Sequence, residues 1–140
     1  MPCSESPERL RRYRERAYRT FLADYGKPEQ RGQRYIAGSL PCLPFGNGSF
    51  DLILVSYLLF VYEDQLDYAF HKESVQEIMR VTRDAGEARI YPLVSFEAQR
   101  CQYLDRLKAD PDLARFHFEE VRTDFEFLLN SNWYLRLTHR

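Results

Sequence analysis

The chain has 140 residues, a formal net charge of −1, and contents of 44% hydrophobic and 29% charged residues. This length and composition predict one folded domain with its own core and argue against a disordered chain. The balanced charge gives no general attraction for nucleic acid, and the longest apolar run is too short and too polar to cross a bilayer.

Residues 8–26 predict an N-terminal helix, because apolar side chains recur at helical spacing and Gly26 and Pro28 follow at its end. The apolar positions are Leu10, Tyr13, Ala17 and Phe21. Six arginines between Arg9 and Arg19 occupy much of the remaining surface. Arginines in this pattern could contact nucleic acid, but the interleaved glutamates favour a solvated helix face, so nucleic acid is not a favoured partner.

The N-terminus contains no apolar segment of the kind that directs secretion, which predicts a cytoplasmic protein. Cys3, Cys42 and Cys101 lie far apart and form no CxxC motif. They therefore favour neither a disulfide framework nor a metal site.

The centre of the chain, residues 35–94, predicts the strands and the helix that organise the fold. Tyr35–Ala37 is expected to form a short strand, and a turn cluster rich in proline and glycine follows it. Phe50–Val55 has apolar residues at both alternating positions, which is typical of a parallel strand covered by helices on both faces. In an open α/β sheet a ligand would lie at the C-terminal end of this strand, here at Ser56 and Tyr57.

The second half of the chain continues the alternation. A helix begins by Glu73 at the latest and is expected to end at Gly86, and residues 88–94 predict a strand with Pro92 near its end. Residues 95–109 predict another helix, and residues 116–127 and 133–138 alternate as in a closing antiparallel pair. The order predicts a single α/β domain over residues 1–140, with a three-layer, Rossmann-like, mostly parallel sheet that ends in the antiparallel pair.

Three segments of the chain resemble class I S-adenosylmethionine-dependent methyltransferases. Leu43–Ile53, LPFGNGSFDLI, resembles the link between the third and fourth strands of that family. Gln76–Val81, QEIMRV, resembles the helix that follows, and Asp84–Ile90 lies where the family has a KPGG turn and its fifth strand. The likeness runs from Glu8 to Arg140 and corresponds to the C-terminal two-thirds of such a domain, so the chain looks like a truncated methyltransferase.

The resemblance also identifies what this sequence lacks. The family holds its cofactor through a first strand with a glycine-rich loop and through an acidic residue that ends the second strand, and neither can be placed here. The only similar pattern, Gly46-Asn47-Gly48, precedes no helix and so cannot present a helix N-terminus to a ligand.

The resemblance implies four residues that would contact S-adenosylmethionine. Ser39 and Leu40 would border the adenine, with Ser39 at the position where the family often has an aspartate. Ser56 and Tyr57 would face the methionine part of the cofactor and the methyl acceptor.

Loss of the first two strands would leave the strand at Phe50–Val55 with an open edge and Tyr35–Ala37 without a neighbour. Three arrangements would satisfy the exposed backbone groups. The short strand could pair with the core strand, a second copy could pair edge to edge in a homodimer, or another chain could supply the missing strands. The first two are favoured.

The first functional hypothesis is a methyltransferase-like enzyme that transfers a methyl group to an unidentified small-molecule acceptor once its cofactor site is completed. Such a reaction depends mostly on binding and orientation, so the sequence identifies no catalytic residue. The alternative is a non-catalytic remnant of the fold that acts as an interaction or dimerisation module through its sheet edge.

Overall fold

The computed structural model describes residues 6–140, and the chain divides into two compact units, residues 1–38 and 39–140. The first unit contains helix α1 (Pro7–Tyr25) and a short 3-10 turn. The second contains the sheet and the remaining helices: β1 (Phe50–Ser56), α2 (Tyr68–Val81), β2 (Thr82–Tyr91), α3 (Leu104–Ala109), β3 (Phe116–Arg122) and β4 (Trp133–His139). The single domain expected from the sequence stays a prediction.

Helix α1 confirms the predicted N-terminal helix. The Ser6 hydroxyl accepts a hydrogen bond from the Arg9 amide at 3.3 Å and so caps the first turn. No residue of α1 is buried, and its aromatic residues Tyr13, Tyr18 and Phe21 are all about half exposed. The helix thus has an apolar stripe without a core around it.

The expected strand at Tyr35–Ala37 is wrong. Tyr35 forms only an isolated bridge with Arg31, and the two residues after it belong to no strand. The Tyr35 ring instead packs against the rings of Phe21 and Tyr25, with centroids 5.5 and 5.1 Å away, and its hydroxyl donates to Asp24 at 2.7 Å. Aromatic contacts within the first unit therefore hold this segment.

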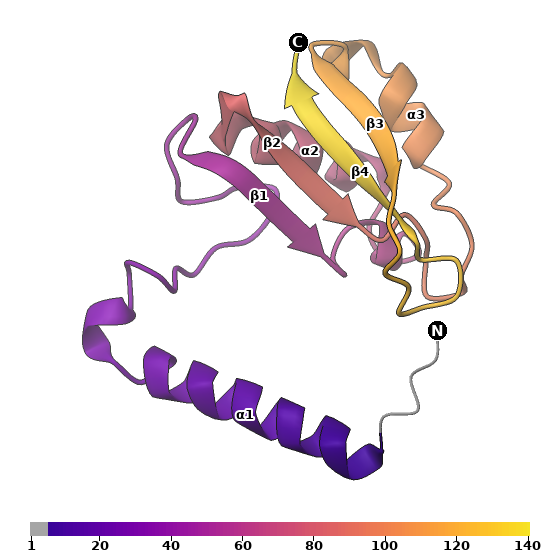
Figure 1. Ribbon diagram of the computed structural model, residues 1–140. Helices are drawn as coiled ribbons and strands as arrows, with labels where there is room; N and C mark the ends of the chain where they lie inside the picture. The colour runs from indigo at the N-terminus through magenta and orange to yellow at the C-terminus, as the bar shows by residue number, and fades with distance from the viewer. Residues whose placement is uncertain (1–5) are drawn as a thin grey trace. The chain divides into compact units, whose positions relative to one another are not determined.

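The second unit is built on one mixed four-stranded sheet in the order β1-β2-β4-β3 (Figure 1). β1 and β2 are parallel, whereas β2–β4 and β4–β3 are antiparallel. The α/β class and the closing antiparallel pair are confirmed. The expectation of a mostly parallel sheet is wrong, since one of the three pairings is parallel.

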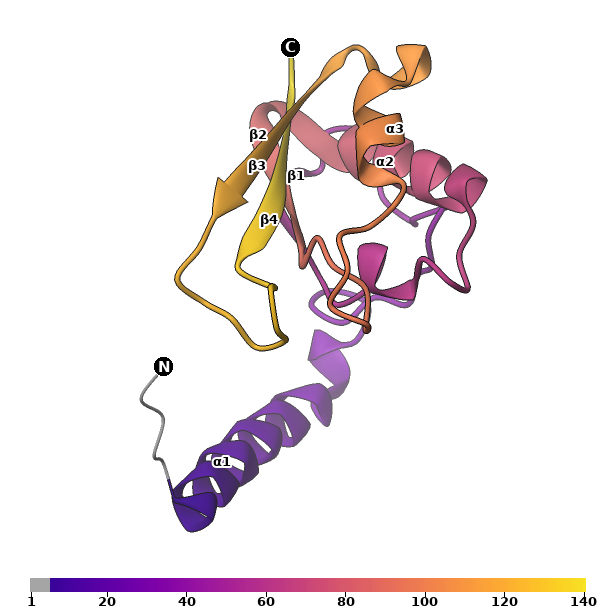
Figure 2. The ribbon, with the colours of Figure 1, turned by 90° about the vertical axis from the view of Figure 1, so that its right-hand side faces the viewer.

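Helices α2 and α3 lie together on one face of this sheet (Figure 2). Ile53 and Val55 of β1 point into the core beneath these helices, but Leu52 and Leu54 are 48% and 68% exposed. The prediction that this strand is buried on both faces is therefore wrong, because no helix of residues 39–140 covers the opposite face. The three-layer arrangement stays a prediction.

Two other expected elements differ from the structure. The helix expected over residues 95–109 is limited to α3, Leu104–Ala109, because residues 93–101 turn back on themselves. The amide of Ser95 donates to the carbonyl of Gln99, and that of Cys101 donates to the carbonyl of Leu93. The first closing strand is expected over residues 116–127, but β3 ends at Arg122, because residues 123–132 form a loop. Pro92 directly follows β2, as predicted.

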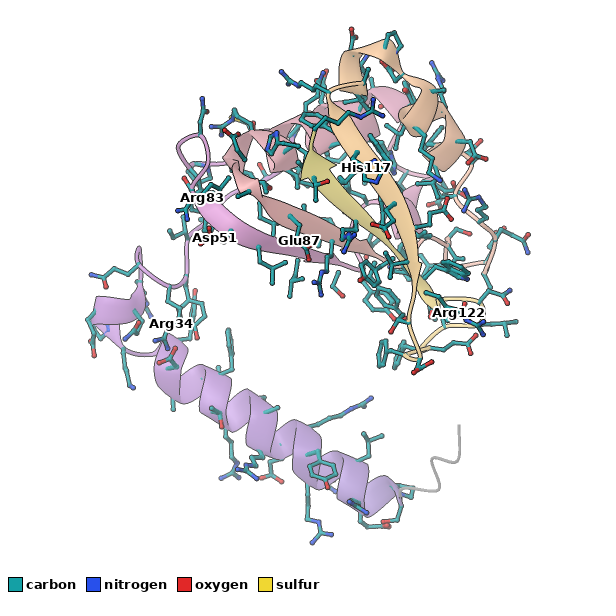
Figure 3. The ribbon with its side chains drawn as sticks, turned by 45° about the horizontal axis from the view of Figure 1, so that its top comes forward. Arg34, Asp51, Arg83, Glu87, His117 and Arg122 are labelled. Atoms are coloured by element: carbon teal, nitrogen blue, oxygen red, sulfur yellow. The ribbon has the colours of Figure 1, made fainter. Side chains whose placement is uncertain are left out.

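Gly86 does not cap α2, which ends at Val81, but lies inside β2. The register of β1 against β2 jumps there, because Phe50 pairs with Thr82 and Leu52 already pairs with Glu87. The bulging residues run past Asp51, and Arg83 forms an ion pair with the Asp51 carboxylate (Figure 3). A Cβ at Gly86 would lie only 2.6 Å from the carbonyl oxygen of Asp51. The parallel pairing thus requires glycine at this position.

We expect Gly86→Ala to lower the free energy of unfolding by about 1–3 kcal/mol, because the added methyl group would push β1 away from β2. Urea unfolding followed by circular dichroism measures the change. Gly46→Ala is the matched control, since its added Cβ would meet nothing closer than the Ser49 hydroxyl at 3.8 Å. Equal stability of the Gly86→Ala variant and the wild type would contradict this account of the bulge.

Candidate functional site

The segment that carries the resemblance is fixed to α2 by one carboxylate. Glu77, which is 8% exposed, accepts hydrogen bonds from the backbone amide of Leu43 at 2.6 Å and from the Arg80 guanidinium at 2.7 and 2.8 Å. Arg80 in turn donates to the side chain of Asn47 and the carbonyl of Leu43. The Arg80 guanidinium, helped by the Leu43 amide, lowers the pKa of Glu77 to about 2.

The hydrogen bonds of Glu77 and Arg80 to the segment before β1 form a clamp. This clamp gives the two motifs of the resemblance a shared physical role. The LPF segment enters the sheet directly before β1, and the QEIMRV segment lies in α2. Glu77 and Arg80 hold the first against the second, so they fix the path by which the chain enters β1. The motifs therefore stabilise the fold, and the clamp itself lies before the N-terminal end of β1 and not at its ligand end.

The predicted adenine-side residues lie in a turn before that clamp. The carbonyl of Ser39 accepts a hydrogen bond from the Cys42 amide at 3.0 Å, and Leu40 packs against the core. Ser39 is exposed, and its hydroxyl makes no hydrogen bond within the described residues. Ser39 is thus free to accept or donate a hydrogen bond, while Leu40 offers an apolar side chain beside it.

The predicted methionine-side residues lie where expected, at the C-terminal end of the parallel pair. Ser56 is the last residue of β1, is exposed, and pairs with Tyr91 at the end of β2. Tyr57 follows with φ 53°, in the left-handed region, and its amide donates to the Tyr91 carbonyl at 2.8 Å. A tyrosine in this backbone conformation is strained, which is a common property of residues at functional sites.

Aromatic rings gather around Tyr57. Its ring meets those of Tyr91 and Phe127 edge-on, with centroids 5.5 and 6.0 Å away, and Tyr91 in turn contacts Phe125 at 5.7 Å. The Tyr57 hydroxyl is buried and has no hydrogen-bond partner within the described part of the chain. Burial, together with the neighbouring Tyr91 hydroxyl, raises the pKa of Tyr57 to about 12. The phenol therefore stays protonated at neutral pH and can donate a hydrogen bond but cannot act as a base.

A pocket of about 450 Å³ opens beside this cluster, on the sheet face opposite α2 and α3. Leu54, Tyr91 and Phe125 supply much of its apolar wall. Arg89 is its charged member, but Glu87 pairs with its guanidinium and the Tyr134 ring lies 5.6 Å from it. Its volume is in the range of small-molecule sites.

The structure thus brings Ser56 and Tyr57 together with residues that the sequence did not single out, above all Tyr91 and Ser131. Tyr91 could have been found, because it ends the strand that runs parallel beside β1. Ser131 could not, because only the fold of the 123–132 loop carries it to Tyr91. Among residues 6–140, no hydrogen bond or ring contact joins Ser39 and Leu40 to Ser56 and Tyr57, so their joint role stays a prediction.

The described residues contain neither a metal-binding cluster nor a helix suited to cross a membrane. No group of three His, Cys, Asp or Glu side chains within residues 6–140 is arranged to hold a metal ion. None of the helices in the described part of the chain combines the length and the hydropathy that a membrane span requires.

Comparison with solved structures finds a similar fold. The PH0226 protein from Pyrococcus horikoshii OT3, a methyltransferase-like structure, superposes with a TM-score of 0.52 at 16% sequence identity. The match covers 96% of this chain and 68% of that one. The chain therefore has a fold similar to that of a methyltransferase-like structure, and this likeness concerns the fold alone.

A relative by sequence is the uncharacterized protein MJ0045 of Methanocaldococcus jannaschii, which is 32% identical over 119 residues. The match takes in 85% of this chain but 49% of the relative, so the chain spans about half the length of that protein. No protein-family model matches the chain.

The clamp predicts a pH-dependent stability. Since folding lowers the Glu77 pKa from 4.5 to about 2, its stabilisation is fully present above pH 4.5 and is lost as the pH falls toward 2. We expect Glu77→Gln to lower the free energy of unfolding by about 2–3 kcal/mol at pH 7, and this loss to shrink as the pH falls through that range. Urea titrations across the range measure both. The control, exposed Glu73→Gln one turn earlier, should stay within about 0.5 kcal/mol of wild type, and an equal loss in both variants would refute the clamp.

Proposed function

We propose that this chain forms the C-terminal, acceptor-side part of an S-adenosylmethionine-dependent methyltransferase, and that it binds the cofactor when the missing strands are supplied. The observation that carries the proposal is the sheet: a parallel pair, β1 and β2, followed by two antiparallel strands, with the open edge at β1. The missing first strand of the resembling family would lie beside that edge. The similarity in fold to a methyltransferase-like structure supports the same assignment.

The open side of the sheet is consistent with a missing part. β1 has a backbone partner on one edge only, and Leu52 and Leu54 project from the face that no helix of residues 39–140 covers. A strand with a free edge and exposed leucines is a template for further pairing. MJ0045 carries about as much sequence outside the match as inside it. A segment of that kind, in the same chain or in a partner, is the occupant that we propose.

The cofactor would supply an electrophilic methyl group, and the residues of this chain would bind and orient the cofactor and the methyl acceptor. Ser39 and Leu40 would border the adenine, the first by a hydroxyl and the second by apolar contact. Ser56 would leave space at the end of β1 for the methionine part, and Tyr57 would face the acceptor. The reaction is an in-line displacement, so its rate depends mainly on this positioning.

The proposal is tested by supplying the missing part. The chain is co-expressed with the portion of MJ0045 outside the matched segment, and S-adenosylmethionine is titrated calorimetrically into the chain alone and into the complex. We expect a Kd tighter than about 100 μM for the complex and no heat for the chain alone. Ser56→Phe should weaken binding at least about tenfold by filling the end of β1, a loss of about 1.4 kcal/mol.

The matched control for that titration is Ser49→Phe, directly before the other end of β1 and also exposed. It should bind as the unchanged complex does, because ligands of open α/β sheets lie at the C-terminal ends of the strands. A complex that forms and yet gives no heat, or equal losses in the two variants, would refute the proposed function.

The second candidate is an interaction module, and the exposed leucines of β1 favour it. Leu54 is the more exposed of the two, at 68%, on the strand that ends the sheet. Two copies could pair through this edge and bury the leucines of both. The product would be a homodimer with a continuous sheet and no need of a cofactor.

Sedimentation velocity over a concentration series distinguishes this candidate. A homodimer through β1 should be weakened about tenfold or more by Leu54→Lys, because a charge would be placed in the new interface. Leu129→Lys is the control, since Leu129 is 71% exposed but lies in the 123–132 loop. A chain that sediments as a monomer at about 100 μM, or equal effects of the two substitutions, would rule out this module.

A further inference from the structure

Tyr57 is unfavourable for the stability of the fold in two independent ways. Its backbone lies at φ 53°, a region that side chains other than glycine rarely adopt. Its hydroxyl is buried without a hydrogen-bond partner among the described residues. Phenylalanine would fill the same space without the second penalty. A polar group kept at this cost, at the ligand end of a parallel strand, points to a role in binding.

A small hydrogen-bond network around Ser131 lies next to Tyr57. The Ser131 hydroxyl donates to the Leu128 carbonyl at 2.6 Å, an oxygen that can only accept, and it accepts from the amides of Phe127 and Leu128. The hydroxyl of Tyr91 lies 2.9 Å from that of Ser131. The Tyr57 hydroxyl is next to these two groups, but it is buried and has no hydrogen-bond partner of good geometry among the described residues.

The surroundings of this donor are apolar rings. Tyr91 and Phe127 pack edge-on against Tyr57, and Phe125 extends the cluster to the wall of the 450 Å³ pocket. Phe125 and Phe127 are 54% and 68% exposed. Because Phe127 buries so little of its own surface, moving its ring away from Tyr57 would cost little.

We propose that the rings of Tyr57, Tyr91, Phe125 and Phe127 bind a flat, apolar ring of the methyl acceptor, and that Tyr57 donates a hydrogen bond to an oxygen or ring nitrogen of that ligand. Rings stack edge-on or offset against such a ligand, and the donor fixes its orientation. Acidic side chains outnumber basic ones in residues 39–140, which disfavours a polyanionic acceptor such as nucleic acid. The identification of the ligand as acceptor rests on the proposed function, but its binding needs no cofactor.

Two probes of equal shape test the site: quinoline, whose ring nitrogen accepts a hydrogen bond, and naphthalene, which has no such atom. Binding to the full chain is followed by NMR chemical-shift titration. We expect quinoline to bind with a Kd of about 1 mM or tighter and naphthalene about threefold to tenfold more weakly. Tyr57→Phe should remove this preference and leave naphthalene binding unchanged. Tyr62→Phe, which alters a tyrosine whose ring contacts Phe96, should keep it.

A stability measurement separates a binding role from a structural one. If the hydroxyl serves a ligand, Tyr57→Phe should melt at the same temperature as the wild type or about 3 °C higher, because a buried unpaired group is removed. A lower Tm would show that the hydroxyl stabilises the fold and would overturn the inference. Binding of neither probe, or a preference for quinoline that survives in Tyr57→Phe, would overturn it as well.

The outcome is independent of the cofactor experiment. A completed protein that binds S-adenosylmethionine while neither probe binds would refute this site and leave the proposed function standing. Probe binding that depends on Tyr57, in a protein that binds no cofactor when completed, would support the site and refute the methyltransferase.

Discussion

Among residues 6–140, strand β1 pairs with another strand along one edge only, and most properties of the second unit follow from this constraint. Along one edge it pairs in parallel with β2, and on one face its side chains join the core under α2 and α3. Along the other edge, and on the other face at Leu52 and Leu54, the described residues of this unit provide nothing. Within the described residues the parallel pairing is therefore the single strand pairing of β1, and Gly86 is the residue that permits its bulge beside Asp51.

The composition of β1 explains both the success and the failure of sequence analysis here. Apolar residues at both alternating positions indicate a strand with two covered faces, and the inference from pattern to environment is sound. Within residues 39–140 no helix covers Leu52 and Leu54 (Figure 2), so half of the pattern stays exposed. The apolar pattern of a strand reflects all the contacts that the strand makes, including contacts with another segment or chain. This is why the position of β1 was predicted correctly and its burial was not.

The candidate site divides in the same way between what local sequence specifies and what the fold assembles. Ser56 and Tyr57 follow from the position of one strand end, which periodicity and turn residues reveal. Tyr91 follows once the parallel partner of that strand is known. Ser131 and Phe127 come from a loop that the sequence suggested would contain strand, and no local signal places them beside Tyr91. Contacts made across distant loops depend on tertiary structure, and periodicity contains no information about them.

The two ends of β1 differ in how well their polar groups are paired. Glu77 and Arg80 form hydrogen bonds with each other and with Leu43, and they anchor the segment that leads into the strand. At the exit, Tyr57 combines a strained backbone with an unpaired hydroxyl. A protein selected for folding alone would satisfy both ends, because buried unpaired groups cost more than a well-packed apolar ring. The contrast between a fully satisfied entry and an unsatisfied exit is the physical reason to place the ligand at the exit. It holds whether the sheet is completed by another part of the protein or by a second copy.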